Sequence, residues 1–304
     1  MTTPPATPAT HVEREIHRQP QAWRQALALL PDVAAALPAA GERVAVVGCG
    51  TSWFMAESYA KLREQSGAGE TDAFAASHFP VGRRYDRVVA ISRSGTTTEV
   101  VRAIEATSSP VVALTAVAST PVDGAADTTI RLDFADEESV VQTVFATTAL
   151  MLLRASLGEQ LEPVIAQAAA MLEAANDLPA AESTQFTFVG QGWAYGIAQE
   201  AGLKMREAAQ LWTEAYPQME YRHGPIAIAE PGRAVWVFGP AVDGLAEDVA
   251  TTGATFIDDD LDPVADLVRA QLLAVRRAKV QLLDPDRPRH LTRSVVLADR
   301  TSPS

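Results

Sequence analysis

The feature that most restricts the fold of this chain is a repeated order of short apolar runs and segments with helical periodicity. The runs suit strands buried on both faces, and they cover residues 44–48, 87–92, 111–115 and 129–133. The helical segments cover about residues 53–64, 97–106 and 140–157. Strands that alternate with helices in this way predict an α/β fold with a mostly parallel sheet.

The same pattern starts again in the second half of the chain. Residues 186–190 form another apolar run that ends in glycine, and Val47-Gly-Cys-Gly50 and Val189-Gly-Gln-Gly192 are offset by 142 residues. An aromatic-bearing helical segment follows each of them. We interpret this as an internal duplication of one α/β unit, although any two strand–glycine–helix units look alike. The remaining predictions are a helical connection over 160–182, a strand over 234–238 and a solvated turn over 258–260.

Charge and cysteine content exclude several functional classes. A formal net charge of −13 disfavours binding to nucleic acid or to an anionic membrane. The single cysteine, Cys49, excludes a disulfide framework and a cysteine-rich zinc site, and it fits a cytoplasmic setting. There is no run of about 18 apolar residues that could span a membrane, and the N-terminus does not resemble a secretory signal.

Other absences and the chain ends complete this picture. No histidine pair has metal-ligand spacing, and no dinucleotide or Gly-Lys-Ser/Thr phosphate-loop motif occurs, so we expect neither a metal nor a cofactor. We expect a disordered tail over residues 1–11 and another over 301–304. A helix should cover about residues 12–37, with an interruption at Pro20.

The sharpest chemical signal is the run Ile91-Ser-Arg-Ser-Gly-Thr-Thr97, in which hydroxyl side chains cluster around a glycine at the end of an apolar run. Thr96 and Glu99 stand at capping-box spacing, which predicts a helix start here. Hydroxyls and backbone N–H groups at the positive end of a helix suit an anion, most naturally a phosphate monoester. Turns and helix caps also use these residue types, so that interpretation stays open.

Two further loops of the first half carry polar side chains. Thr51 and Ser52 follow the first apolar run, and Ser139 with Gln142 predicts a cap that opens a helix at Val140. Open parallel sheets bind ligands at the carboxyl ends of their strands. Three such loops in one half therefore suggest a ligand crevice there.

The second half carries charged groups of another kind. Glu200, Lys204 and Glu207 are spaced so that they share one face of a helix. A solvated salt-bridge face is the common alternative, but this helix follows a glycine turn and has apolar flanks. Glu207 could act as a general acid/base that moves a proton between adjacent sugar carbons. His223 stands in a Gly-Pro loop, where a lone histidine more often has a structural role than a functional one.

These residues resemble a known family. Residues 91–97 resemble the phosphate loop of the sugar isomerase (SIS) family. Five further segments resemble parts of the isomerase domain of glucosamine-6-phosphate synthases and occur in the same order along the chain. They are residues 13–20, 198–207, 214–216, 222–225 and 288–294. The resemblance covers about residues 12–297. It implies two tandem SIS units, 12–160 and 161–304, each a five-stranded parallel sheet flanked by helices, and a homodimer with a shared active site.

The resemblance also implies roles for individual residues. Its phosphosugar ligands fall on Ser92, Arg93, Ser94 and Thr97, with Thr51 or Ser52 nearby and Val140 and Gln142 against the sugar. Glu207 falls on the proton-shuttling glutamate, with Glu200 and Lys204 as its supporting charges. His223 falls on the ring-opening histidine, which in the family comes from the neighbouring subunit.

Two departures from the family pattern bear on the chemistry. The Schiff-base lysine of the family aligns with Arg293, whose guanidinium cannot be that nucleophile but could bind phosphate or carboxylate. Arg93 replaces a glutamine and adds positive charge near the anion. Since we also expect no glutaminase domain, the chain should not draw ammonia from glutamine.

The expected function is therefore that of a phosphosugar isomerase or deaminase. It would open the ring of a 6-phosphorylated amino sugar or aldose/ketose and transfer a proton between C1 and C2, with or without release of ammonia. The alternatives are a fructosamine-6-phosphate deglycase and a non-catalytic sugar-phosphate sensor.

Overall fold

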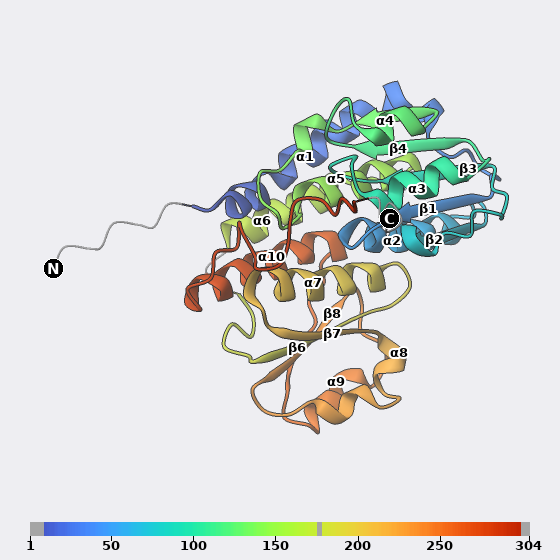
Figure 1. Ribbon diagram of the computed structural model, residues 1–304. Coiled ribbons are helices and arrows are strands. Elements are labelled where there is room, and N and C mark those ends of the chain that lie inside the picture. The colour runs from blue at the N-terminus through green and yellow to red at the C-terminus, as the bar shows by residue number, and fades with distance from the viewer. Residues whose placement is uncertain (1–8, 175–177, 299–304) are drawn as a thin grey trace, which may run out of the picture.

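The computed structural model describes residues 9–174 and 178–298, which form two parallel sheets with helices around and between them (Figure 1). The first sheet, sheet A, has the strand order β2-β1-β3-β4-β5, and the second, sheet B, has the order β7-β6-β8-β9. All strand pairs of both sheets are parallel within the described residues. The predicted α/β class is therefore confirmed, but sheet B has four strands among the described residues where five were expected.

The strands of sheet A are β1 (Val44–Gly48), β2 (Thr71–Ala75), β3 (Arg87–Ile91), β4 (Val111–Thr115) and β5 (Thr128–Arg131). Those of sheet B are β6 (Gln185–Gly190), β7 (Trp212–Pro217), β8 (Arg233–Phe238) and β9 (Thr255–Ile257). The helices of the first half are α1 (His11–Val33), α2 (Thr51–Gln65), α3 (Thr98–Ala106), α4 (Pro121–Ala125), α5 (Val144–Ser156) and α6 (Glu162–Glu173). Those of the second are α7 (Ala194–Ala209), α8 (Gln218–Tyr221), α9 (Leu245–Ala250) and α10 (Pro263–Val280).

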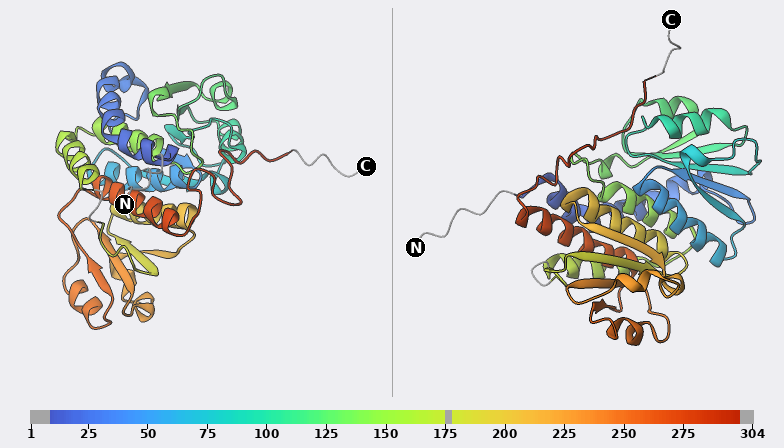
Figure 2. Two further views of the ribbon diagram at one scale, coloured as in Figure 1. Left: turned by 90° about the vertical axis from the view of Figure 1, so that its left-hand side faces the viewer. Right: turned by 60° about the horizontal axis from the view of Figure 1, so that its bottom comes forward.

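One hydrophobic core joins the two halves of the molecule. The inner face of sheet A and the aromatic inner face of sheet B, with Phe188 and Trp236, both belong to it. Helices α2, α5, α7 and α10 lie between the two sheets and fill the space between these faces (Figures 1 and 2). The outer faces are covered separately, that of sheet A by α3 and that of sheet B by α8 and α9. This central layer fixes α7 against α2, which matters for the site.

The N-terminal helix differs from its prediction in two ways. It starts at His11, because Thr10 and Glu13 form a capping box, so residues 9–11 are not a tail as expected. It also continues through Pro20 without the predicted interruption. Proline leaves the carbonyl four residues earlier without its N–H partner. Here that carbonyl, of Ile16, accepts a hydrogen bond from Gln19 Nε2 at 3.2 Å instead. Residues 1–8 and 301–304 lie outside the described residues.

One predicted helix start and two predicted helix caps are wrong, whereas α3 begins within one residue of its predicted start. Helix α5 begins at Val144, not Val140, and Ser139 and Gln142 do not cap it. The buried Glu137 carboxylate accepts the N–H groups of residues 143, 144 and 145 instead. Helix α3 has Thr97 as its N-cap without a side-chain bond, so the box expected from Thr96 does not form. The connecting helix α6 is shorter than predicted, whereas 258–260 is exposed as expected.

Two general features bear on function. No helix among the described residues is long and apolar enough to cross a bilayer. Within the same residues, no group of three or more His, Cys, Asp or Glu side chains is arranged to hold a metal ion.

Candidate active site

Lys204 is the centre of a polar cluster at the contact between α7 and the start of α2. Its ammonium lies 2.5 Å from Glu207 Oε2, 3.4 Å from Glu200 Oε1 and 3.1 Å from Thr51 Oγ1. Thr51 is the first residue of α2, directly after the glycine loop that ends β1. The structure therefore brings together four of the residues singled out from the sequence, three on one helix face and one from the first half.

Burial sets the electrostatics of this cluster. Glu200 and Lys204 are each 1% exposed, whereas the Glu207 side chain is 18% exposed. Burial raises the pKa of Glu200 to about 8, with Lys204 opposing the shift. Burial acts to lower the pKa of Lys204, but the carboxylates of Glu200 and Glu207 outweigh it, so the net direction is upward. At neutral pH a mostly protonated Glu200 thus lies behind an ammonium that pairs with the Glu207 carboxylate.

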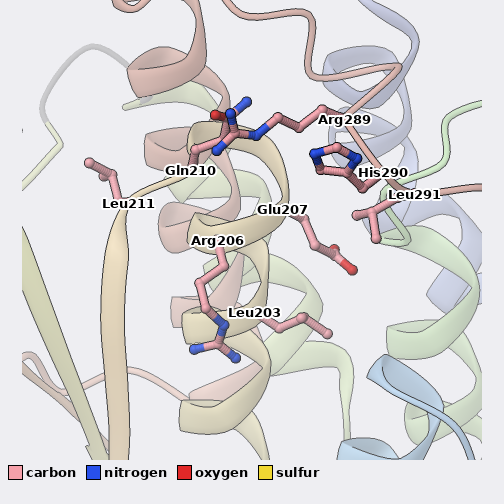
Figure 3. Close-up of a pocket in the computed structure, with 8 residues that line it drawn as sticks. All are labelled: Leu203, Arg206, Glu207, Gln210, Leu211, Arg289, His290 and Leu291. Atoms are coloured by element: carbon pink, nitrogen blue, oxygen red, sulfur yellow. The ribbon is translucent and has the colours of Figure 1, made fainter.

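Glu207 faces a cavity of about 390 Å³. Figure 3 shows its side chain extending from α7 toward the chain segment that carries Arg289, His290 and Leu291. Leu203, Arg206, Gln210 and Leu211 complete the lining. A partly exposed carboxylate on a buried ammonium, at the wall of a cavity, can take up and return a proton. Arg289 and His290 were missed as site residues, although the 288–294 motif that contains them was noticed.

The loop after β3, residues 92–97, carries four hydroxyl side chains, and we call it the hydroxyl loop. It is covered by a C-terminal segment, residues 292–297, which we call the strap. Ser294 Oγ lies 3.1 Å from Ser94 Oγ, 2.9 Å from Thr96 Oγ1 and 3.5 Å from Thr97 Oγ1. The N–H of Thr98 donates to Val295 O at 3.1 Å, which holds the strap in place. Three loop hydroxyls thus converge on one oxygen atom, in the arrangement that a phosphate oxygen would need.

The remaining predicted ligands of the first half have different surroundings. Ser52 and Ser92 are buried, and Ser92 Oγ has no partner among the described residues. Gln142 Oε1 is likewise buried and unpaired within the described residues, while the N–H of Val140 donates to Asp286 O at 3.3 Å. Unsatisfied buried polar atoms are rare in folded proteins, so Ser92 Oγ and Gln142 Oε1 are candidates to bond a ligand.

Arg93 and Arg293 donate hydrogen bonds to backbone carbonyl oxygens and do not form an open anion site. Arg93 is buried and donates to Ser139 O and to Arg293 O, both at 3.0 Å. Burial lowers the pKa of Arg93, against the opposing effect of the nearby Glu137 carboxylate. Arg293 donates to Glu137 O and pairs with Asp136. Together these contacts attach the strap to the loop that precedes α5.

His223 lies apart from this cluster. It is exposed in the turn after α8, and it is not among the described residues that line the Glu207 cavity. Within one chain, therefore, His223 does not line the cavity that Glu207 faces.

Comparison with known proteins shows which proteins the chain resembles in sequence. No family model matches the chain. It is 28% identical to glutamine–fructose-6-phosphate aminotransferase [isomerizing] of Methanothermobacter thermautotrophicus, over 93% of this chain and 57% of the relative. The corresponding protein of Aeropyrum pernix gives the same figures. The chain's homologues are the isomerase (SIS) domains of these aminotransferases. The chain therefore spans somewhat over half the length of the curated relatives it matches.

Solved structures show the same fold. Glucosamine-6-phosphate deaminase from Thermotoga maritima matches with a TM-score of 0.81 and 23% identity, over 95% of this chain and all of the other. Tagatose-6-phosphate ketose/aldose isomerase from Escherichia coli matches with a TM-score of 0.76 and 19% identity, over 92% of this chain and 97% of the other. The predicted resemblance is confirmed at the level of relatives: the curated relatives are glutamine–fructose-6-phosphate aminotransferases, and a glucosamine-6-phosphate deaminase and a tagatose-6-phosphate isomerase share the fold.

Proposed function

We propose that the chain is an amino-sugar-6-phosphate deaminase/isomerase, which opens the sugar ring, moves a proton between C1 and C2 and releases ammonia. The observation that carries this proposal is the Glu207 carboxylate, 2.5 Å from the buried Lys204 ammonium at the wall of a cavity. One chain segment, 289–297, runs from that cavity to the hydroxyl loop. A substrate with a phosphate at one end and a reacting carbon pair at the other fits this arrangement.

The chemistry follows from the geometry of Glu207. With the phosphate on the hydroxyl loop in place of Ser294, Glu207 would remove the proton from C2 of the open-chain amino aldose. Return of that proton to C1, together with transfer of one amine proton to O1, converts the aldehyde to an alcohol and leaves an imine at C2. Addition of one water to the imine expels ammonia and gives a ketose 6-phosphate, so atoms balance. Lys204 holds the carboxylate in position, and protonated Glu200 adds no charge that would weaken this pair.

The shared active site belongs to this proposal. His223 is exposed in the half that carries sheet B, where a second subunit could receive it. In a homodimer, each subunit would present His223 to the cavity of the other and supply the acid that opens the ring.

The direct test measures ammonia and ketose phosphate released from glucosamine 6-phosphate by the purified protein. We expect equal amounts of both, and loss of both in Glu207→Gln with ligand binding retained. Glu105→Gln, which changes an exposed glutamate of α3, is the matched control and should behave like the parent. Ketose formation from an aldose 6-phosphate without ammonia release would leave simple isomerisation as the function. Binding without turnover of either substrate would favour the sensor.

A further inference from the structure

A second cavity, of about 500 Å³, lies at the carboxyl ends of the strands of sheet B. Gln191 and Trp193 reach it from the connection after β6, and Gln218 from the residue after β7. The segment 238–242 reaches it from the end of β8, and Leu261 and Pro263 follow β9. Gln65, the last residue of α2, closes one side. All four strands of this sheet therefore contribute to one hollow.

The position of this cavity is the one where open parallel sheets bind ligands. The chain goes from β6 to β7 on one side and then crosses back to β8 on the other, which makes β6 and β8 the strands that flank the switch point. In sheet A, β1 and β3 have the same relation, and the hydroxyl loop and Thr51 follow them. The cavity in sheet B is therefore the positional counterpart of the candidate phosphosugar site.

The lining of this cavity disfavours a phosphate. No lysine, arginine, serine or threonine is among the described residues that line it. Trp193, Phe238 and Pro240 instead give it an apolar surface. Gln218 Nε2 donates to Pro240 O at 2.9 Å, and its Oε1 accepts the N–H of Val242 at 2.8 Å. The loop after β8 is thereby fixed, so this wall of the cavity is formed in advance.

Negative charge beside the cavity favours a positively charged ligand over a negatively charged one. An adjoining cavity of about 400 Å³ is lined by Asp258, Asp259 and Asp260. It shares residues 239–241 and Leu261 with the 500 Å³ cavity of sheet B. Asp259 pairs with Arg269 at 2.7 Å, whereas no ion pair is formed by the other two within the described residues. Two exposed carboxylates beside an apolar hollow repel a phosphate and attract an ammonium group.

We propose that this cavity is a second ligand site, which binds a small unphosphorylated amine with its apolar face on Trp193 and its ammonium toward Asp258 and Asp260. A free amino sugar has this chemistry, since its ring presents an apolar face and its hydroxyls can bond the side-chain amides of Gln65 and Gln191. The volume of the cavity lies in the range of small-molecule sites. This site goes beyond the proposed function and does not depend on it.

The experiment is calorimetric titration of the full chain with glucosamine, with glucose as the uncharged probe and excess inorganic phosphate present to occupy the hydroxyl loop. We expect saturable binding of glucosamine, with glucose about threefold to fivefold weaker because exposed charge pairs contribute little. The double change Asp258→Asn and Asp260→Asn should lower glucosamine affinity by the same factor, and Glu105→Gln should leave it unchanged. Ala241→Phe, which fills the cavity from the loop after β8, should abolish binding.

Three results would overturn the proposal. They are the absence of saturable glucosamine binding, equal affinity for glucosamine and glucose, and binding that survives Ala241→Phe, which would place the ligand elsewhere. If Ala241→Phe does not fold, the aspartate variants decide by themselves. Because the readout is binding of an unphosphorylated probe, failure here leaves the deaminase proposal untouched, and the reverse also holds.

Discussion

Replacing Glu200 by glutamine should make the protein more resistant to unfolding as the pH rises. Glu200 is buried beside Lys204, and the Lys204 ammonium is already matched by Glu207. Glutamine has nearly the shape of a protonated glutamic acid, so Glu200→Gln copies the form that the fold favours. The change should therefore be close to neutral in acid and stabilising near pH 8.

The size of the effect follows from the pKa of Glu200. This pKa is about 8 in the folded protein against an ordinary value of 4.5, so between these values the folded state holds a proton that the unfolded chain has released. The free energy of unfolding then falls as pH rises, by at most about 1.4 kcal/mol per unit. Over this window the loss amounts to roughly 4 kcal/mol, and the glutamine variant does not suffer it.

Urea unfolding followed by circular dichroism from pH 5 to 8.5 measures this difference. We expect the stability of Glu200→Gln relative to the parent to increase steadily up to about pH 8 and then to level off. Glu105→Gln serves as the exposed control, and its stability relative to the parent should stay flat. A difference for Glu200→Gln that stays constant within about 1 kcal/mol would mean that Glu200 is ionised in the folded protein, which would refute the reasoning.

Three further predictions concern the strap, the hydroxyl loop and the core. Ser294→Ala should bind inorganic phosphate about fivefold more tightly by calorimetry, because a competing hydroxyl is gone. Gly95→Ala should lower the free energy of unfolding in urea by about 2 kcal/mol or more, since φ is +63° and a Cβ would meet a threonine hydroxyl at 2.2 Å, whereas Gly124→Ala meets nothing. Trp236→Phe should cost about 1–3 kcal/mol by the same assay, because the buried Asp266 carboxylate loses a donor at 2.8 Å. Weaker phosphate binding by Ser294→Ala would contradict the first expectation. Equal free energies of unfolding for the two glycine variants would contradict the second, and an unchanged free energy of unfolding for Trp236→Phe would contradict the third.

The strands that could be predicted are the ones buried on both faces. β1 and β4 are buried along their whole length, and a continuous apolar run marks such strands in the sequence. The strands that were missed, β2, β7 and β9, lie at the edges of sheets A and B, and most of their residues are exposed or half-exposed. Their mixed composition carries no clear period, so the sequence did not distinguish them from loops.

Helix boundaries depended on side chains that local rules do not consider. Proline normally predicts a break, but Gln19 supplies the donor that Pro20 lacks. The start of α5 is set by the Glu137 carboxylate, which reaches three N–H groups from six to eight positions away. Neither device belongs to the usual capping patterns, which involve residues within one turn of the helix start.

The candidate site was predictable where helical spacing alone decides it. Glu200, Lys204 and Glu207 share a face because of the period of the helix, and the structure places them within ion-pair distance. Thr51, 153 positions from Lys204, reaches it only because α2 packs on α7. Ser294, 198 positions from Thr96, was not anticipated, since tertiary packing alone brings the strap to the hydroxyl loop.

The central claim is that Glu207 carries the proton between C1 and C2, and exchange with solvent tests it most directly. The protein would be incubated with glucosamine 6-phosphate or fructose 6-phosphate in D₂O, and deuterium at C1 and C2 followed by NMR. We predict that the parent incorporates deuterium at these carbons and that Glu207→Gln, which still binds the sugar phosphate, does not. Incorporation by Glu207→Gln at the parent rate would contradict the assignment of Glu207.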